Sequence, residues 1–153
     1  MSHRLHLAAV ALLVLGARAA LAQKKPTAER AEFAGASATA PLSQYVRVGE
    51  TIYLSGILGT GPDGTLAPGG IAAETRQALT NVRAALDKSG ATLDDVVKCT
   101  VFLVDMQEWA AMNEVYATFF VRHKPARSAI GVSGLARNGR VEIECLAVRG
   151  AGS

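Results

Sequence analysis

The stretch Arg140-Val-Glu-Ile-Glu-Cys-Leu-Ala-Val148 alternates between apolar and polar side chains along most of its length. A β-strand turns successive side chains to opposite faces, so one face of this segment carries Val141, Ile143, Cys145 and Ala147. The earlier stretch Asp95-Val-Val-Lys-Cys-Thr-Val-Phe-Leu-Val104 alternates in the same way, and its apolar face carries Val97, Cys99, Val101 and Leu103. These two segments predict two strands that each turn one face to a core.

Further elements are expected on both sides of these strands. Residues 45–48 and 51–55 are β-rich runs joined at Gly49-Glu50, which predicts a hairpin. Apolar residues at helical spacing predict a helix over residues 71–88, with Gly90 as its C-terminal stop. One more strand is expected over residues 128–132.

A second helix is expected to begin at Asp105, because Glu108 follows three residues later in a capping-box-like pattern. Its apolar stripe is expected in the core and consists of Trp109, Met112, Tyr116 and Phe119. The order β-β-α-β-α-β-β predicts an α+β domain whose helices pack on one face of a mixed sheet. The opposite face mixes Thr, Phe, Leu and charged side chains, which favours a subunit interface and a homo-oligomer.

The segment Lys124-Pro-Ala-Arg127 places an arginine upstream of Glu142 and Glu144 on the last predicted strand. An arginine fork fits a carboxylate bidentately and holds a small organic acid in one orientation. A nearby glutamate can then orient or activate a water molecule. The pattern indicates hydrolysis of a small carboxylate-bearing substrate. The alternative is an ordinary solvated pair on a sheet surface.

The first residues have the pattern of a secretory signal peptide. Arg4 precedes an unbroken apolar run over residues 7–15, and Ala20-Leu-Ala22 is a small-x-small cleavage site. The run is too short to cross a bilayer as a mature helix, although an uncleaved amphipathic anchor is the alternative. We expect residues 1–22 to be a Sec-type signal peptide cleaved after Ala22, residues 23–40 a flexible arm, and residues 41–149 the folded domain. The alternative for the arm is that part of it pairs at a sheet edge. The expected location is periplasmic or secreted.

Removal of residues 1–22 changes the charge of the chain. The whole chain has 16 Lys and Arg against 13 Asp and Glu, and the leader contains Arg4 and Arg18 but no acid. The mature protein therefore has 14 basic side chains against 13 acidic ones. A near-neutral balance does not favour nucleic acid as a partner, and no membrane partner is expected after cleavage.

Cys99 and Cys145 are the two cysteines, and each lies on the apolar face of a predicted strand. An exported protein can pair its cysteines, but a buried thiol behaves as a small hydrophobe, and we expect both to be free. His123 is the only histidine after the leader, and no CxxC motif occurs. No metal site is expected from this set.

The chain resembles the RidA family, also called YjgF or reactive intermediate deaminases, from about Pro41 to Val148. The resemblance rests on the order and spacing of several motifs together. These are Ser43-Gln44, Ile52-Tyr-Leu-Ser-Gly56, Asn81, Asp95-Val-Val-Lys98, Thr100-Val-Phe-Leu103, Asn113-Glu-Val-Tyr116, Pro125-Ala-Arg-Ser128 and Val141-Glu-Ile-Glu144.

The resemblance implies a chorismate-mutase-like fold assembled as a homotrimer, with ligand clefts between subunits and neither metal nor cofactor. It implies hydrolysis of enamine or imine carboxylates such as 2-aminoacrylate to 2-oxo acids and ammonia. By position, Arg127 would clamp the substrate carboxylate and Glu142 would orient the attacking water. Ser55, Gly56 and Asn113 would line the cleft. Alternation does not separate Glu142 from Glu144, so this assignment rests on the resemblance.

Several residues depart from the family pattern. Leu42 stands where typical members have a tyrosine, Ile57 where they have a glutamine, and Ala129 where a cysteine is frequent. These changes make one end of the expected pocket more apolar. The alternative function is therefore a non-catalytic, small-acid-binding or chaperone-like trimer of the same fold. Endoribonuclease activity, a third reading, ranks last because the mature chain is near neutral.

Overall fold

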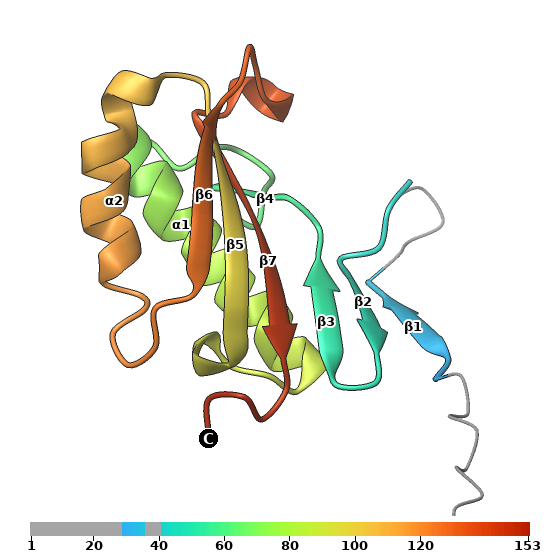
Figure 1. Ribbon diagram of the computed structural model, residues 1–153. Coiled ribbons are helices and arrows are strands. Elements are labelled where there is room, and N and C mark those ends of the chain that lie inside the picture. The colour runs from blue at the N-terminus through green and yellow to red at the C-terminus, as the bar shows by residue number, and fades with distance from the viewer. Residues whose placement is uncertain (1–28, 36–40) are drawn as a thin grey trace, which may run out of the picture.

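The computed structural model describes residues 29–35 and 41–153 (Figure 1). The expected signal peptide, residues 1–22, lies outside the described residues. The strands of the described part are β1 (Ala31–Ala34), β2 (Tyr45–Val48), β3 (Thr51–Leu54), β4 (Ile57–Leu58), β5 (Val96–Leu103), β6 (Ala126–Gly131) and β7 (Val141–Val148). The helices are α1 (Ile71–Ser89) and α2 (Trp109–Ala117), with short 3-10 turns η1 (Leu93–Asp95), η2 (Met106–Glu108) and η3 (Ala136–Asn138).

All seven strands form one mixed sheet in the order β1-β2-β3-β7-β5-β6, and β4 pairs with a further stretch of β7. Neighbouring strands are antiparallel except β5 and β6, which run parallel. Figure 1 shows α1 and α2 on the same side of the sheet. The predicted α+β order is confirmed, and β1 and β4 are additional short strands. Within the described residues, no helix is long and apolar enough to span a membrane.

The core lies between the sheet and the two helices. One face of α1 is buried, as its helical spacing predicted, and includes Ala78, Leu79, Val82, Ala85 and Leu86. Each fully buried leucine or valine side chain among them contributes about 1.5–3 kcal/mol. The helix ends as predicted at Gly90, whose φ of 78° is the left-handed conformation that glycine adopts without strain.

A bulge changes the predicted face of β5 at its first residues. The alternation from Cys99 onward is as predicted, but the register against β7 shifts between Val96 and Lys98. Val96 is therefore buried, whereas Val97 is 38% exposed and does not belong to the core face. The bulge depends on the partner strand, so alternation within β5 alone could not reveal it.

The two cysteines form a disulfide, so the prediction of free thiols is wrong. Cys99 of β5 and Cys145 of β7 lie directly opposite each other in the antiparallel ladder, with their Cα atoms 4.1 Å apart. Both are on the buried face that alternation predicted. Their pairing follows from the register between two strands that are distant in sequence, which neither strand's pattern contains.

The start of the second helix also differs from the prediction. The carboxylate of Asp105 accepts a hydrogen bond from Gln107 N at 2.9 Å and caps the 3-10 turn η2, after which α2 begins at Trp109. Glu108 does not complete a capping box. It forms an ion pair with Arg140 at the entrance to β7.

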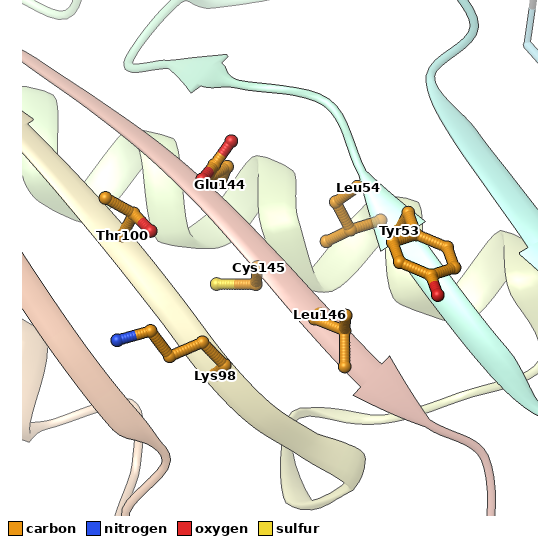
Figure 2. Close-up of a pocket in the computed structure, with 7 residues that line it drawn as sticks. All are labelled: Tyr53, Leu54, Lys98, Thr100, Glu144, Cys145 and Leu146. Atoms are coloured by element: carbon orange, nitrogen blue, oxygen red, sulfur yellow. The ribbon is translucent and has the colours of Figure 1, made fainter.

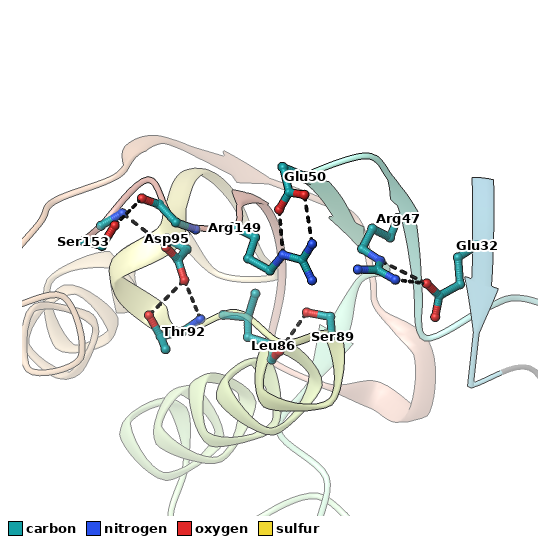
Figure 3. Close-up of polar contacts among 11 residues, drawn as sticks. Glu32, Arg47, Glu50, Leu86, Ser89, Thr92, Asp95, Arg149 and Ser153 are labelled. Carbon is teal, nitrogen blue, oxygen red and sulfur yellow. Dashed lines mark hydrogen bonds and ion pairs between the residues drawn. The ribbon is translucent and has the colours of Figure 1, made fainter. Parts of the chain in front are cut away.

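Asp95 fastens the C-terminal segment to the domain (Figure 3). Its carboxylate accepts hydrogen bonds from Thr92 N at 2.8 Å, Thr92 Oγ1 at 3.1 Å, Gly150 N at 2.9 Å and Gly152 N at 3.1 Å. Burial by itself raises the pKa of Asp95, but these hydrogen bonds outweigh it and hold the pKa below the ordinary 3.8. At the same end of the sheet, Arg149 donates two hydrogen bonds to Glu50.

Candidate functional site

Arg127 is the second residue of β6 and lies beside Cys99 of β5 in the parallel register. Its guanidinium carbon is 4.5 Å from the ring centroid of Tyr116 and 5.8 Å from that of Trp109, both on α2. Among the described residues, its side chain has neither an ion pair nor a hydrogen bond to another side chain. The arginine predicted to clamp a carboxylate is therefore held by aromatic rings, with its N–H donors available to a ligand.

A hollow of ≈ 310 Å³ lies next to this arginine. Asn113, the other predicted binding residue on this side, lines the hollow together with Arg127. The complete lining is Asn113, Tyr116, Ala117, Phe120, Lys124, Pro125 and Arg127. The structure thus brings Arg127 and Asn113 together, in a volume within the range of small-molecule sites.

Tyr116 and Trp109 belong to this site as well as to the helix stripe. Tyr116 is buried, and Met112, one helical turn before it, is fully buried, as predicted for the core. Trp109 is 40% exposed, which corrects the prediction that it lies in the core. The signal that sequence reasoning missed is the spacing of Trp109, Asn113 and Tyr116, which puts all three on one face of α2.

Burial raises the pKa of the Tyr116 phenol to about 12, although the neighbouring positive charge of Arg127 acts in the opposite direction. The phenol therefore stays protonated at physiological pH. It offers the guanidinium a neutral ring face and does not supply a competing negative charge.

The second predicted group of site residues surrounds Glu142 on β7. Gly56 lies against its carboxyl group so closely that a Cβ atom on Gly56 would be 2.8 Å from the Cδ atom of Glu142. Any larger residue here would force the Glu142 carboxyl group to move, so the close approach, and not the backbone conformation, favours glycine. Ser55 precedes it, with its hydroxyl donating to the carbonyl of Ser43 at 2.7 Å and its N–H to the carbonyl of Gln44 at 3.2 Å. Ser55, Gly56 and Glu142 thus form one cluster.

Arg127 and Glu142 lie on opposite faces of the sheet. Residues that stand directly opposite on neighbouring strands turn their side chains to the same face, so Arg127 shares the helix-covered face with Cys99. Glu142 stands opposite Phe102, on the other face. Within one chain the structure therefore does not bring the two predicted catalytic residues together. It forms two half-sites, one with Arg127 and Asn113 and the other with Ser55, Gly56 and Glu142.

Glu144 occupies a different place on the same open face as Glu142. It lines a hollow of ≈ 200 Å³ over the middle of the sheet, whose other polar or aromatic members include Tyr53, Lys98 and Thr100 (Figure 2). The Nζ atom of Lys98 donates to Ser128 Oγ at 2.8 Å. Glu142 therefore differs from Glu144 in its contact with Gly56, a distinction that strand alternation does not contain.

The apolar departures from the family pattern are close in sequence to Ser55 and Gly56, but Ile57 turns its side chain to the core face and away from Glu142. Leu42 is 57% exposed and immediately precedes Ser43, the partner of Ser55. Ile57 is half-buried on β4, next to Gly56, and stands opposite Ile143. Tyr45 does not replace the missing phenol, because it is buried and its hydroxyl donates to the Lys88 carbonyl at 3.3 Å.

The fold and these half-sites define a small α+β protein with an arginine held against two aromatic rings and, separately, a glutamate packed on a glycine. Comparison with known proteins specifies its family. The family model described as Endoribonuclease L-PSP matches residues 34–149. The chain belongs to this family, which is also the YjgF/RidA family.

Several relatives and solved structures are similar to this chain. A goat (Capra hircus) protein named 2-iminobutanoate/2-iminopropanoate deaminase is 47% identical over 115 residues, which cover 74% of this chain and 84% of the relative. The human protein of the same name is 42% identical over 114 residues, covering 74% and 83%. The crystal structure of yeast Mmf1 has a TM-score of 0.71 at 38% identity and covers 80% of this chain and 98% of that one. E. coli TdcF with bound serine has a TM-score of 0.69 at 34% identity, covering 82% and 99%.

Proposed function

We propose that this protein is a deaminase that hydrolyses small enamine or imine carboxylates to 2-oxo acids and ammonia. The observation that carries the proposal is Arg127, an arginine stacked on Tyr116 at the edge of a hollow of ≈ 310 Å³. Relatives that are 42–47% identical and named 2-iminobutanoate/2-iminopropanoate deaminase support the reaction class. The serine bound to TdcF supports a ligand with the size and carboxylate of a small amino acid.

In this proposal the residues divide the reaction between them. Arg127 binds the substrate carboxylate bidentately, and the enamine takes a proton from solvent on its β-carbon to become the iminium ion, which is the protonated imine. Glu142 accepts a proton from water as the water oxygen bonds to the imine carbon, and the proton is then passed to nitrogen. The hydroxyl group formed from water then loses its proton to solvent as the carbon–nitrogen bond breaks, and ammonia and the 2-oxo acid leave. Arg127 raises the reaction rate by holding the substrate close to the attacking water. Glu142 raises it by about 10²–10⁴-fold as a general acid–base.

We further propose that the active sites lie between subunits of a homotrimer. Arg127 and Glu142 are on opposite faces of the sheet. A complete active site therefore needs Arg127 from one subunit and Glu142 from a neighbouring subunit. The open face of the sheet carries exposed apolar side chains that suit such an interface, including Phe33, Tyr53 and Ile130. The number of subunits follows from the family resemblance.

Mixing two inactive variants tests the shared site. Arg127→Ala and Glu142→Gln should each abolish 2-oxo acid release, because each removes one half-site. Co-refolded together they should regain about a quarter of wild-type activity, since random assembly pairs an intact arginine with an intact glutamate in about one interface in four. A mixture as inactive as its components, with a trimeric mass by sedimentation, would refute the shared site.

Arg122→Ala is a matched control for the clamp. Arg122 is also an arginine close to β6, but its side chain is exposed and paired with Asp94 at 2.9 Å. Arg122→Ala should leave turnover of 2-aminoacrylate and 2-iminobutanoate unchanged, whereas Arg127→Ala abolishes it. Equal turnover in both variants would contradict the deaminase proposal. Binding of small 2-oxo acids without any turnover would support the small-acid-binding alternative, which Leu42 and Ile57 favour.

We propose that the mature protein is exported after loss of residues 1–22. The leader pattern carries this proposal, and the Cys99–Cys145 disulfide is consistent with it because disulfides persist in oxidising compartments. N-terminal sequencing of protein recovered from the periplasm or medium should begin at Gln23. Recovery of the intact chain from the reducing cytoplasm would contradict export.

A further inference from the structure

The arginines of the described chain differ in the groups that hold their side chains. Four of these pair with a carboxylate, namely Arg47 with Glu32, Arg122 with Asp94, Arg140 with Glu108 and Arg149 with Glu50. Arg127 instead lies over the two rings of Tyr116 and Trp109 and lines the hollow of ≈ 310 Å³, whereas Arg83 lies over Phe119 and does not line this hollow. The contrast indicates that this guanidinium is fixed in place without an acid that would occupy its donors.

The geometry of a guanidinium explains why rings suit a carboxylate clamp. Its five N–H donors lie in the plane of the group, whereas an aromatic ring contacts its flat face. Stacking therefore restrains the side chain while its in-plane donors stay open to a bidentate carboxylate. A protein carboxylate in the same position would compete with the substrate for these donors.

The rings of Tyr116 and Trp109 differ in exposure, and we expect them to restrain Arg127 in different ways. Tyr116 is 6% exposed and packs against Phe120 with ring centroids 4.7 Å apart and the rings tilted by 36°, so it is anchored in the core. Trp109 is the first residue of α2 and is 40% exposed beside the clamp. A large ring at this position restrains the guanidinium at the surface, where a ligand arrives.

We propose that Trp109 is a positioning residue for Arg127, and that a carboxylate bound to Arg127 changes the surroundings of the Trp109 ring. The identity of the substrate in this proposal rests on the proposed function. The contact between the Trp109 ring and Arg127 does not depend on that function. Because an arginine loses rotamer freedom when it binds, a clamp already restrained by a ring binds its ligand more tightly.

Two substitutions at Trp109 separate positioning from general structure. Trp109→Leu should raise KM for the imino acid about 5- to 30-fold, the range of one partly desolvated cation–π contact, with a smaller effect on kcat. Trp109→Phe keeps a ring and should restore most of the loss. Phe119→Leu is the control, because Phe119 stacks on a different arginine, Arg83, at 5.0 Å and should leave KM unchanged. A wild-type KM in Trp109→Leu would overturn the proposal.

Fluorescence gives a readout that does not depend on turnover. Trp109 is the single tryptophan of the chain, so its emission reports on this position alone. Titration with 2-oxobutanoate, an unreactive carboxylate, should shift or quench the emission in the wild type and not in Arg127→Ala. Emission that does not respond overturns the positioning proposal even if the enzyme turns over imines. A response without any turnover supports the positioning and refutes the deaminase function.

Discussion

Loss of the Cys99–Cys145 disulfide should lower the free energy of unfolding by about 4 kcal/mol. The bond joins residues separated by 46 positions. For a loop of that length the chain-entropy relation gives about −13.5 cal/mol/K, or about 4 kcal/mol at 25 °C. The reduced thiols stay on the buried face and pack as small apolar groups, so the loop term dominates. With a urea m-value of about 2 kcal/mol/M, the unfolding midpoint should fall by about 2 M.

Urea unfolding of the mature protein, followed by circular dichroism with and without a reductant, measures this difference. The double variant Cys99→Ala/Cys145→Ala is the control, because its midpoint should lie near that of the reduced wild type and should not respond to the reductant. A thiol titration under denaturing conditions confirms which samples are oxidised. Equal midpoints for oxidised and reduced wild type would refute the loop-entropy reasoning.

Three further substitutions test other contacts. Gly56→Ala should displace the Glu142 carboxyl group and lower kcat by about 10²-fold or more. The control Gly134→Ala, whose Cβ would meet nothing within 4 Å, should leave kcat unchanged. An unchanged kcat in Gly56→Ala would show that Glu142 is not a catalytic residue. The folded-state pKa of Asp95 is lowered, so the stability it contributes is fully present above its unfolded pKa and is lost as the pH falls through the folded value. The unfolding free energy of the wild type should therefore fall between pH 6 and pH 3, and that of Asp95→Asn should fall less. Urea titrations at the two pH values measure both. An identical pH dependence of the two proteins would contradict this prediction. Tyr116→Phe removes a buried hydroxyl that has no hydrogen-bond partner among the described residues, so stability should be equal or higher, and a loss of more than about 1 kcal/mol would reveal an unrecognised partner.

The local pattern of the sequence predicted the elements well where short-range physics decides them. The spacing of Leu79, Val82 and Leu86 predicted α1, and Gly90 ends it because the left-handed conformation suits glycine. The alternation in β7 is confirmed along its whole length. The strand β4 was not predicted, since two residues are too few to show a period and their pairing with β7 decides them.

The site residues divide in the same way. Residue types and motif order in the sequence singled out Arg127, Glu142, Ser55, Gly56 and Asn113 as candidates. Their grouping into two half-sites depends on which strands pair, in which direction and in which register. The exposure of Trp109 beside Arg127 likewise depends on how α2 lies against β6, which the spacing within the helix does not specify.

The sequence by itself determined the class of fold, the limits of most elements, the resemblance to the family and the chemistry available to a site. These properties follow from side-chain type and from periodicity over a few residues. The tertiary structure decided the Cys99–Cys145 bond, the bulge at Val96, and the separation of Arg127 from Glu142 by the thickness of the sheet. Each of these depends on contacts between β5, β6 and β7, and pairing between distant strands is set by the packing of the whole domain.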